Sequence, residues 1–271
     1  MSFSVIIPVY NRAHSIQRAL QSVKAQKRPA DEVIVVDDGS EDDLEAALQS
    51  FGDVILLQQP HQGVSAARNL GIRHARSNWI ALLDSDDEWL PDKLQCQQAC
   101  ILAHEDIRVV HTDEIWIRNG VRVNPGKRHR KSGGWIFRHC LPLCAMSPSS
   151  IVIHRDVLEA VGGFDESLPA CEDYDLWLRI TSRFPVEYLD IPLIRKYGGH
   201  ADQLSRQFWG MDRFRIRALE KVICSGQLSP EDRQAACEML QSKCRVYMQG
   251  LKKRGRDEEW KHYQALLDRV L

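Results

Sequence analysis

Two hydrophobic periods alternate along the first third of the chain. Short apolar runs at residues 5–9, 33–36, 54–57 and 79–83 predict buried β-strands. Between them, apolar side chains recur at helical spacing, which predicts helices over about residues 64–76, through Ile16, Leu20 and Val23, and through Leu44, Ala47, Leu48 and Phe51. Strands that alternate regularly with helices predict an α/β fold, in which a mostly parallel sheet carries helices on both faces.

The middle of the chain follows neither period for long. Residues 115–123 alternate around Asn119 and Gly120, a dipeptide that favours a two-residue β-hairpin turn. The basic segment 127–131, which two glycines follow, leaves two interpretations open: a lid over an anionic substrate, or a solvated loop.

From about Phe208 to the end, the pattern is helical. The apolar positions fall on three stripes, which are Ile216, Leu219, Val222 and Ile223, then Met239, Leu240, Cys244, Val246 and Tyr247, then Trp260, Tyr263, Leu266, Leu267 and Val270. Amphipathic stripes usually face a core, so we expect them to dock on the main domain. Formation of a homodimer through these helices, and peripheral contact with a membrane, are the alternatives.

Composition narrows the choice of partners. The 271 residues carry a formal net charge of -1, so no global field attracts nucleic acid or membrane. No apolar stretch reaches the length of about 20 residues that a membrane-spanning helix needs, and the first residues lack the basic region of a signal peptide. We therefore expect a soluble, cytoplasmic protein, with attachment to the inner face of the cell membrane as the alternative.

The eight cysteines are scattered through the chain, and we expect reduced thiols. Cys96 and Cys100 stand four residues apart, as do Cys140 and Cys144, which on helices would place each pair on one face. Ordinary buried cysteine is the favoured interpretation over a zinc site, because the Cys-x-x-Cys spacing of such sites is absent.

Polar residues follow three of the predicted strands. They are residues 10–12, 37–40 and 84–87, and the carboxyl ends of parallel strands share one edge of a sheet, where ligands collect. Asp84-Ser85-Asp86-Asp87 would concentrate negative charge there, as a site for Mg²⁺ or Mn²⁺ requires. The alternatives are helix caps at Asn11, at Ser40 with Asp43, and before Pro91. A calcium loop fits poorly, since Trp89 stands where such a loop needs glycine.

A second acidic group opens a later predicted helix. Residues 172–179 follow a glycine turn at Gly162 and Gly163, and Leu176, Trp177 and Ile180 form the inner face of the helix. Asp175 has a partner one turn on in Arg179, whereas Glu172 and Asp173 have no obvious partner. Because the helix dipole favours the ionised form of a carboxyl in the first turn, either of these two could serve as a base.

Five motifs together resemble the family 2 glycosyltransferases of GT-A fold, in the order and spacing of that family from Ser4 to about Ser205. They are Val5-Ile6-Ile7-Pro8-Val9-Tyr10-Asn11, Val35-Val36-Asp37-Asp38-Gly39-Ser40, Gly63-Val64-Ser65-Ala66-Ala67-Arg68-Asn69, Asp84-Ser85-Asp86-Asp87 and Gly162-Gly163-Phe164-Asp165-Glu166. The resemblance implies a GT-A domain over residues 1–205, with a nucleotide-binding half at about 1–113 and an acceptor and catalytic half at about 114–205. Residues 206–271 would form a helical C-terminal extension.

The resemblance also implies an activity and roles for single residues. A sugar would pass from a nucleotide donor, typically UDP-linked, to a hydroxyl of a saccharide or lipid-linked saccharide acceptor in surface polysaccharide or glycolipid synthesis, with inversion at the anomeric carbon. The implied roles are nucleotide binding for Pro8, Tyr10, Asn11, Asp38, Arg68 and Asp84, metal binding for Asp86 and His200, and general base for Asp173 of the Glu172-Asp173 pair.

Three rival functions remain to be weighed. A sugar-1-phosphate nucleotidyltransferase would carry a glycine-rich loop after the first strand, where this chain has none. A phosphoacceptor receiver domain would leave Glu172 and Asp173 unexplained. A non-catalytic nucleotide-sugar-binding or scaffold protein stays open as the alternative, although the presence of both Asp86 and Asp173 argues for an enzyme.

Overall fold

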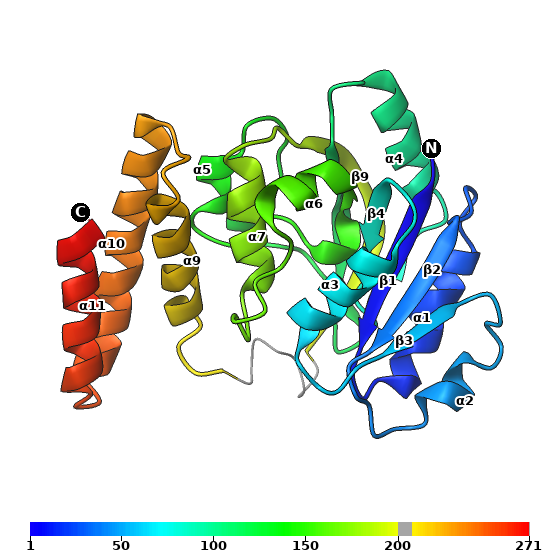
Figure 1. The fold of residues 1–271 in the computed structure, drawn as a ribbon, viewed down its shortest axis with the longest axis horizontal. Coiled ribbons are helices and arrows are strands. Elements are labelled where there is room, and N and C mark those ends of the chain that lie inside the picture. The colour runs from blue at the N-terminus through cyan, green and yellow to red at the C-terminus, as the bar shows by residue number, and fades with distance from the viewer. Residues whose placement is uncertain (200–207, 271) are drawn as a thin grey trace.

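The computed structural model describes residues 1–199 and 208–270. In that part of the chain, nine strands form one sheet in the order β3-β2-β1-β4-β8-β6-β9-β5, with β7 paired to β6 (Figure 1). The strands are β1 (Phe3–Val9), β2 (Glu32–Asp37), β3 (Ile55–Gln58), β4 (Trp79–Leu82), β5 (Glu88–Trp89), β6 (Val109–Arg118), β7 (Val121–Val123), β8 (Val152–His154) and β9 (Glu187–Gly198). The α-helices are α1 (Ala13–Lys24), α2 (Leu44–Leu48), α3 (Val64–His74), α4 (Lys93–Ala103), α5 (Phe137–Cys140), α6 (Arg155–Val161), α7 (Glu172–Thr181), α9 (Asp212–Cys224), α10 (Pro230–Lys252) and α11 (Asp257–Val270).

The first half of the sheet is parallel, as the sequence predicts. β1 pairs in parallel with β2 and β4, and β2 pairs in parallel with β3. Side chains alternate between the two faces, so Ile6 belongs to the core beneath α3, while Val5 and Ile7 belong to the core beneath α1. The prediction of helices on both faces is therefore confirmed. Only Phe51 departs from its predicted helix, since α2 ends at Leu48.

The second half of the sheet is mixed. β8 pairs antiparallel with both β4 and β6, β6 pairs in parallel with β9, and β5 pairs antiparallel with β9. The predicted hairpin is confirmed as β6 and β7, and Asn119 and Gly120 have φ values of 50° and 77°. Positive φ at both central residues is the signature of a type I′ turn, which matches the twist of the strands.

Helix α3 lies very close to the sheet at Gly71. A Cβ atom at this position would stand 2.5 Å from Cγ2 of Ile6 and 3.2 Å from Cγ2 of Val36. Such distances are below van der Waals contact, so a larger residue would push the helix away from the strands. Glycine at position 71 thus sets the separation of α3 from β1 and β2.

The C-terminal helices dock on the α/β body. α9 packs against α7, α10 packs against α9 and α5, and α11 packs against α10 (Figure 1). Their apolar stripes join the same core as Trp177 of α7, which confirms docking for nearly all predicted positions. Val246 is the exception, since it is 60% exposed. Among the described residues, no helix is both long and apolar enough to cross a membrane.

The cysteines carry free thiols. Cys96 and Cys100 share α4, but Cys140 is the last residue of α5 and Cys144 lies beyond it, so that pair does not share a helical face. The chain turns after α5 because Leu141 is followed by a proline, which cannot continue the hydrogen-bond ladder.

Candidate active site

The carboxyl ends of β1 and β2 are joined by hydrogen bonds between their following loops. The backbone N–H of Asn11 donates to Ser40 Oγ at 3.0 Å, and Asn11 Oδ1 accepts from the N–H of Glu41 at 2.7 Å. Asn11 adopts a left-handed φ of 51°, and Arg12 rather than Asn11 is the residue before α1. The capping alternative for Asn11 is therefore wrong. Asp43, and not Ser40, caps α2 by accepting from the N–H of Ala46.

Asp38 is buried at the end of β2 and holds the following loop. Oδ1 accepts from Gln59 Nε2 at 2.6 Å and from the N–H of Gln62 at 2.9 Å, while Oδ2 accepts from the N–H of Gly63 at 2.8 Å and contacts His61 Nδ1 at 2.9 Å. A carboxylate has about four acceptor positions, so this one is fully used. The predicted bond to a nucleotide base remains a prediction, and it requires one donor, most easily the half-exposed His61, to move aside.

Tyr10 gives this end of the sheet an aromatic surface. Its ring is 40% exposed and stacks on His61 with centroids 4.0 Å apart. Pro8 lies two residues earlier, buried within β1. A flat, partly exposed pair of rings is suited to stacking with a base, which agrees with the predicted role of Tyr10 without testing it.

The acidic segment after β4 is held by four partners from separate parts of the chain. Asp84 Oδ1 accepts from Arg68 at 2.7 Å, and Asp86 Oδ2 accepts from Arg12 at 2.8 Å. Asp87 is buried and accepts from Ser149 Oγ at 2.6 Å and from the N–H of Tyr197 at 2.9 Å. Burial, together with the nearby charges of Asp86 and Asp84, raises the pKa of Asp87 well above its ordinary value.

Arg68 connects this acidic segment to the start of α7. The side chain projects from α3, is almost fully buried, and places Nη2 2.7 Å from Asp84 and Nη1 2.7 Å from Glu172 Oε1. Burial alone would lower the pKa of Arg68, but the two carboxylates outweigh it and raise that pKa. Glu172 thus has a partner that its sequence neighbourhood does not reveal, and the expectation that it lacks one is wrong. Burial and Asp173 still raise its own pKa.

The residue after Arg68 explains why two distant motifs occur together. Asn69 Oδ1 accepts from the N–H of Phe164 at 2.9 Å, and Asn69 Nδ2 donates to the carbonyl of Phe164 at 2.9 Å. Phe164 follows the Gly162 and Gly163 turn, and its ring lies 5.0 Å from the Arg68 guanidinium. The turn therefore anchors α3 and covers one side of Arg68.

Asp173 is partly exposed beside Glu172. Its Oδ1 accepts from the N–H of Tyr174 at 2.7 Å, and its Oδ2 accepts from Cys144 Sγ at 3.1 Å. Burial and then the charge of Asp173 raise the pKa of Cys144 well above its ordinary value. The thiol therefore stays protonated and donates a hydrogen bond to Asp173. The carboxylate is held in one orientation while part of it still reaches solvent.

Lys196 was not predicted from the sequence, yet it approaches both sides of the site. Its Nζ donates to Ser147 Oγ at 2.8 Å. Burial would lower its pKa, but Glu114 and Asp87 are the first of several acids that raise it, so the ammonium stays charged. No sequence signal identifies this lysine, because β9 carries it to the site from far along the chain.

Two predicted residues remain, Asp175 and His200. Asp175 pairs with Arg179 at 2.6 Å as predicted. His200 lies outside the described residues. Among the described residues, no group of three or more His, Cys, Asp or Glu side chains is arranged to hold a metal ion.

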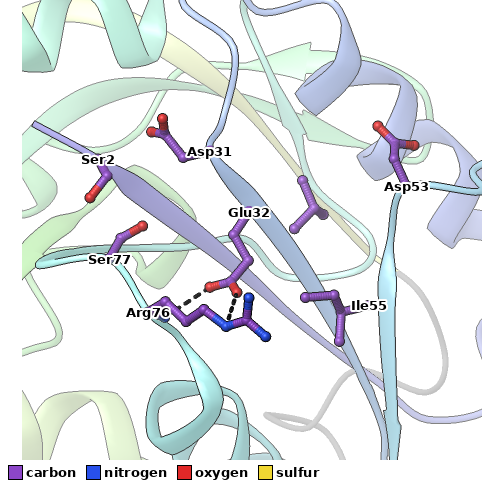
Figure 2. A pocket seen from close by; sticks show the side chains of 8 residues that line it. Ser2, Asp31, Glu32, Asp53, Ile55, Arg76 and Ser77 are labelled. Carbon is purple, nitrogen blue, oxygen red and sulfur yellow. Dashed lines mark hydrogen bonds and ion pairs between the residues drawn. The ribbon is translucent and has the colours of Figure 1, made fainter.

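Two cavities are lined by residues other than the predicted site residues. One, of about 340 Å³, opens at the amino-terminal ends of β1, β2 and β3 (Figure 2). Its lining includes Glu32, which accepts from the N–H of Arg76 at 3.0 Å, and none of the predicted site residues. The second, of about 460 Å³, is lined by the basic segment 127–131. Lys131 is buried there against Glu114 at 2.9 Å, so at this residue the segment is neither lid nor solvated loop.

Comparison with known proteins agrees with this geometry. The profile of glycosyl transferase family 2 matches residues 4–155, and that of a glycosyltransferase-like family 2 matches residues 137–225. An uncharacterized glycosyltransferase of Rickettsia prowazekii is 32% identical over 206 residues, which are 74% of this chain and 64% of the relative. The chain thus spans just under two thirds of that relative.

A relative with a defined reaction and a solved structure extend the comparison. The UDP-Glc:alpha-D-GlcNAc-diphosphoundecaprenol beta-1,3-glucosyltransferase WfgD of Escherichia coli is 30% identical over 65% of this chain and 68% of its own length. The crystal structure of S. aureus TarS 1-349 in complex with UDP-GlcNAc superposes with a TM-score of 0.72 at 20% identity, over 89% of this chain and 70% of that one. The predicted GT-A fold is confirmed, and the chain belongs to glycosyl transferase family 2.

Proposed function

We propose that this protein is a metal-dependent, inverting glycosyltransferase that moves a sugar from a UDP-sugar to a hydroxyl of a saccharide or lipid-linked saccharide. One observation carries the proposal. Arg68 bonds Asp84, at the end of a nucleotide-side strand, and Glu172, the residue before the predicted base, each at 2.7 Å. A single side chain thus joins the part of the edge suited to a nucleotide and the part suited to proton transfer.

Asp173 acts on the acceptor in this proposal. An acceptor hydroxyl becomes a good nucleophile when a positioned carboxylate removes its proton, a contribution of roughly a hundred- to ten-thousandfold in rate. The bonds from Cys144 and from the N–H of Tyr174 hold the carboxylate, and because the residue is partly exposed its remaining acceptor positions are available to a hydroxyl. Glu172 is committed to Arg68 and serves to position it.

The acidic segment fits a divalent ion that arrives with the donor. Mg²⁺ in nucleotide enzymes commonly takes one or two protein carboxylates together with phosphate oxygens and waters, so a set smaller than three protein ligands suffices. Asp86 and Asp84 are partly exposed and each offers a carboxylate. When bound, the ion would stabilise charge on the departing UDP as a Lewis acid. Arg12, now paired with Asp86, would turn toward the phosphates.

The nature of donor and acceptor is supported by the relatives. WfgD is named for a UDP-glucose donor, a diphosphoundecaprenol-linked acceptor and a β-1,3 product, and TarS was solved with UDP-GlcNAc. We extend from these names the classes of substrate, a UDP-sugar and a saccharide carried on a lipid diphosphate. The sugar itself depends on a few side chains of the pocket.

The test is release of UDP from a panel of UDP-sugars in the presence of Mn²⁺ or Mg²⁺, with wild type and Asp173→Asn. We expect turnover in wild type and a loss of roughly a hundredfold or more in the variant, with UDP binding nearly unchanged, because asparagine cannot accept the proton. Asp156→Asn, an exposed carboxyl of α6, is the matched control and should keep full activity. Binding of UDP without turnover in wild type would favour a non-catalytic binding protein. Full activity in Asp173→Asn would assign the base elsewhere.

A further inference from the structure

The turn between α10 and α11 presents a dense group of basic side chains. Lys252, Lys253, Arg254 and Arg256 are all exposed, with only Gly255 between them. In the described part of the chain, Lys252 and Lys253 make no ion pair, while Arg256 pairs with Glu259 at 2.9 Å. Three acids follow at the start of α11. Asp257 is exposed and makes no ion pair with the described residues, Glu259 pairs with Arg256, and Glu258 pairs with Lys261 at 2.8 Å. Five basic side chains, with Lys261 included, thus stand against three acids. Positive charge therefore dominates the tip of this helical pair, which we call the basic tip.

An exposed tryptophan lies within the same group. The ring of Trp209 is 40% exposed, and the guanidinium carbons of Arg254 and Arg256 lie 4.8 and 5.3 Å from its centroid. The inner side of the ring packs on Tyr247 of α10 with centroids 5.7 Å apart. Gly210 permits this approach, since a Cβ there would stand 2.8 Å from Tyr247. The chain thus fixes a tryptophan between two arginines at the surface.

A third arginine, Arg213, follows Trp209 closely in sequence and makes no ion pair with the described residues. Arg213 lies in the first turn of α9, and its N–H donates to the Gly210 carbonyl at 3.0 Å. Its Nε is buried without a hydrogen-bond acceptor, and the described residues supply no ion pair to its guanidinium, which lies 4.6 Å from the ring of Phe214. A half-buried cation without a counterion is a place where an external anion would be stabilised.

The basic tip and the carboxyl end of β1 face the same side of the molecule, although they lie toward opposite ends of its long axis (Figure 1). In Figure 1, β1 runs downward from the N-terminus, so its carboxyl end is at the bottom, and the turn between α10 and α11 is also at the bottom. A flat surface that touches the tip on this side would therefore face the carboxyl ends of the parallel strands instead of their amino-terminal ends.

We propose that the basic tip, with Trp209, docks on the anionic surface of a lipid bilayer. Tryptophan and arginine prefer the headgroup region, where an amphipathic ring and a cation are both satisfied, and clustered Lys and Arg are attracted to anionic lipid. A compact group of cations at one helical turn suits insertion among headgroups better than the extended row of phosphates of a nucleic acid, which would need a longer basic stripe. The docking deepens the proposed function, and rests on it, in that it would bring the site to a lipid-linked acceptor.

Vesicle flotation tests the docking without any transferase assay. Full-length protein is mixed with vesicles of phosphatidylcholine, with or without phosphatidylglycerol, and wild type is compared with a Lys252→Ala, Lys253→Ala, Arg254→Ala variant. We expect wild type to float with the anionic vesicles only and to be released by high salt, and the variant to bind at least about tenfold more weakly. Trp209→Ala should weaken binding as well, with less dependence on salt.

A charge-matched control separates local docking from loss of net positive charge. Lys127→Ala, Arg128→Ala, Arg130→Ala removes the same charge from the other exposed basic segment and should leave flotation unchanged. Equal loss in both triple variants, or binding of wild type to neutral vesicles alone, would overturn the proposal. The proposal would also be overturned if wild type bound a nucleic-acid probe and the Lys252→Ala, Lys253→Ala, Arg254→Ala variant did not. UDP release with a water-soluble acceptor should be the same in wild type and in the 252–254 variant, so failure of docking is distinct from failure of the proposed function.

Discussion

Two buried carboxylates at the same edge of the sheet are satisfied in opposite ways. Asp38 takes its bonds from the segment 59–63 next to it on the sheet, by backbone N–H groups and neutral or weakly basic side chains. Glu172 depends on one charged group, Arg68, which comes from a helix 104 residues earlier. The comparison teaches that the proposed nucleotide side of the edge is largely built from local loops, whereas the side that carries the proposed base depends on a single remote charge.

The largest expected effect breaks the remote pairing. Arg68→Met should lower the free energy of unfolding by about 3–5 kcal/mol, because it leaves Glu172 and Asp84 without their counterion. The cost is large because Glu172 is buried. Urea denaturation followed by circular dichroism measures this. Arg73→Met is the control on the same helix, since its pair with Glu166 spans 3.9 Å at the surface, and it should change stability by less than about 1 kcal/mol. Similar losses in the two variants would show that Arg68 does not hold the two motifs together.

Breaking the local arrangement should cost less. In Asp38→Asn the amide nitrogen would face the N–H donors that now meet a carboxylate oxygen, with an expected loss of about 1–3 kcal/mol in the free energy of unfolding. Because asparagine keeps one oxygen acceptor and the substitution leaves no buried charge unpaired, the effect should stay below that of Arg68→Met. The exposed Asp53→Asn serves as control. A larger loss for Asp38→Asn than for Arg68→Met would reverse the comparison.

The pH dependence of stability sharpens the same contrast. The folded protein raises the pKa of Glu172, so this group binds a proton more tightly when folded than when unfolded. Its contribution to stability is complete below the ordinary glutamate pKa of 4.5 and is lost as the pH rises through the raised value. Glu172→Gln does not titrate, so the variant should gain stability relative to wild type as the pH rises above the ordinary glutamate pKa of 4.5. Parallel pH profiles of the two proteins would contradict the raised pKa.

The smallest effect concerns the hydrogen bond to the proposed base. Cys144→Ala removes the thiol donor at 3.1 Å from Asp173 and should lower kcat severalfold with little change in KM for the donor. Cys144→Ser keeps a donor and should restore most of the rate. Equal rates in the two variants would mean that the thiol only fills space.

Sequence reasoning succeeded where a feature depends on neighbours along the chain. The order of the first strands and helices, the turn at Asn119 and Gly120, and the start of α7 at Glu172 all follow from periodicity and turn chemistry. The motifs also identified Arg68 and Asp84 as members of one site, and the structure brings them together.

Sequence reasoning failed where a partner arrives through topology. Nothing in the order of residues says that β8 inserts between β4 and β6, and this arrangement carries Ser149 to Asp87. Lys196 and Cys144 reach the site in the same manner, from segments with no motif. Hydrophobic period defines which face of a strand is buried, but it does not define which strand lies beside it, so such pairings need coordinates.

Gly71 determines whether the guanidinium of Arg68 can contact both Asp84 and Glu172. One turn before it on the same helix, Arg68 extends to two acids on separate segments, and the spacing of that helix from the strands is set where a hydrogen atom stands in place of a side chain. A single methyl group at position 71 would displace α3 and, with it, the guanidinium of Arg68. A residue without a side chain therefore sets the distance between α3 and the sheet on which the two ion pairs of Arg68 depend.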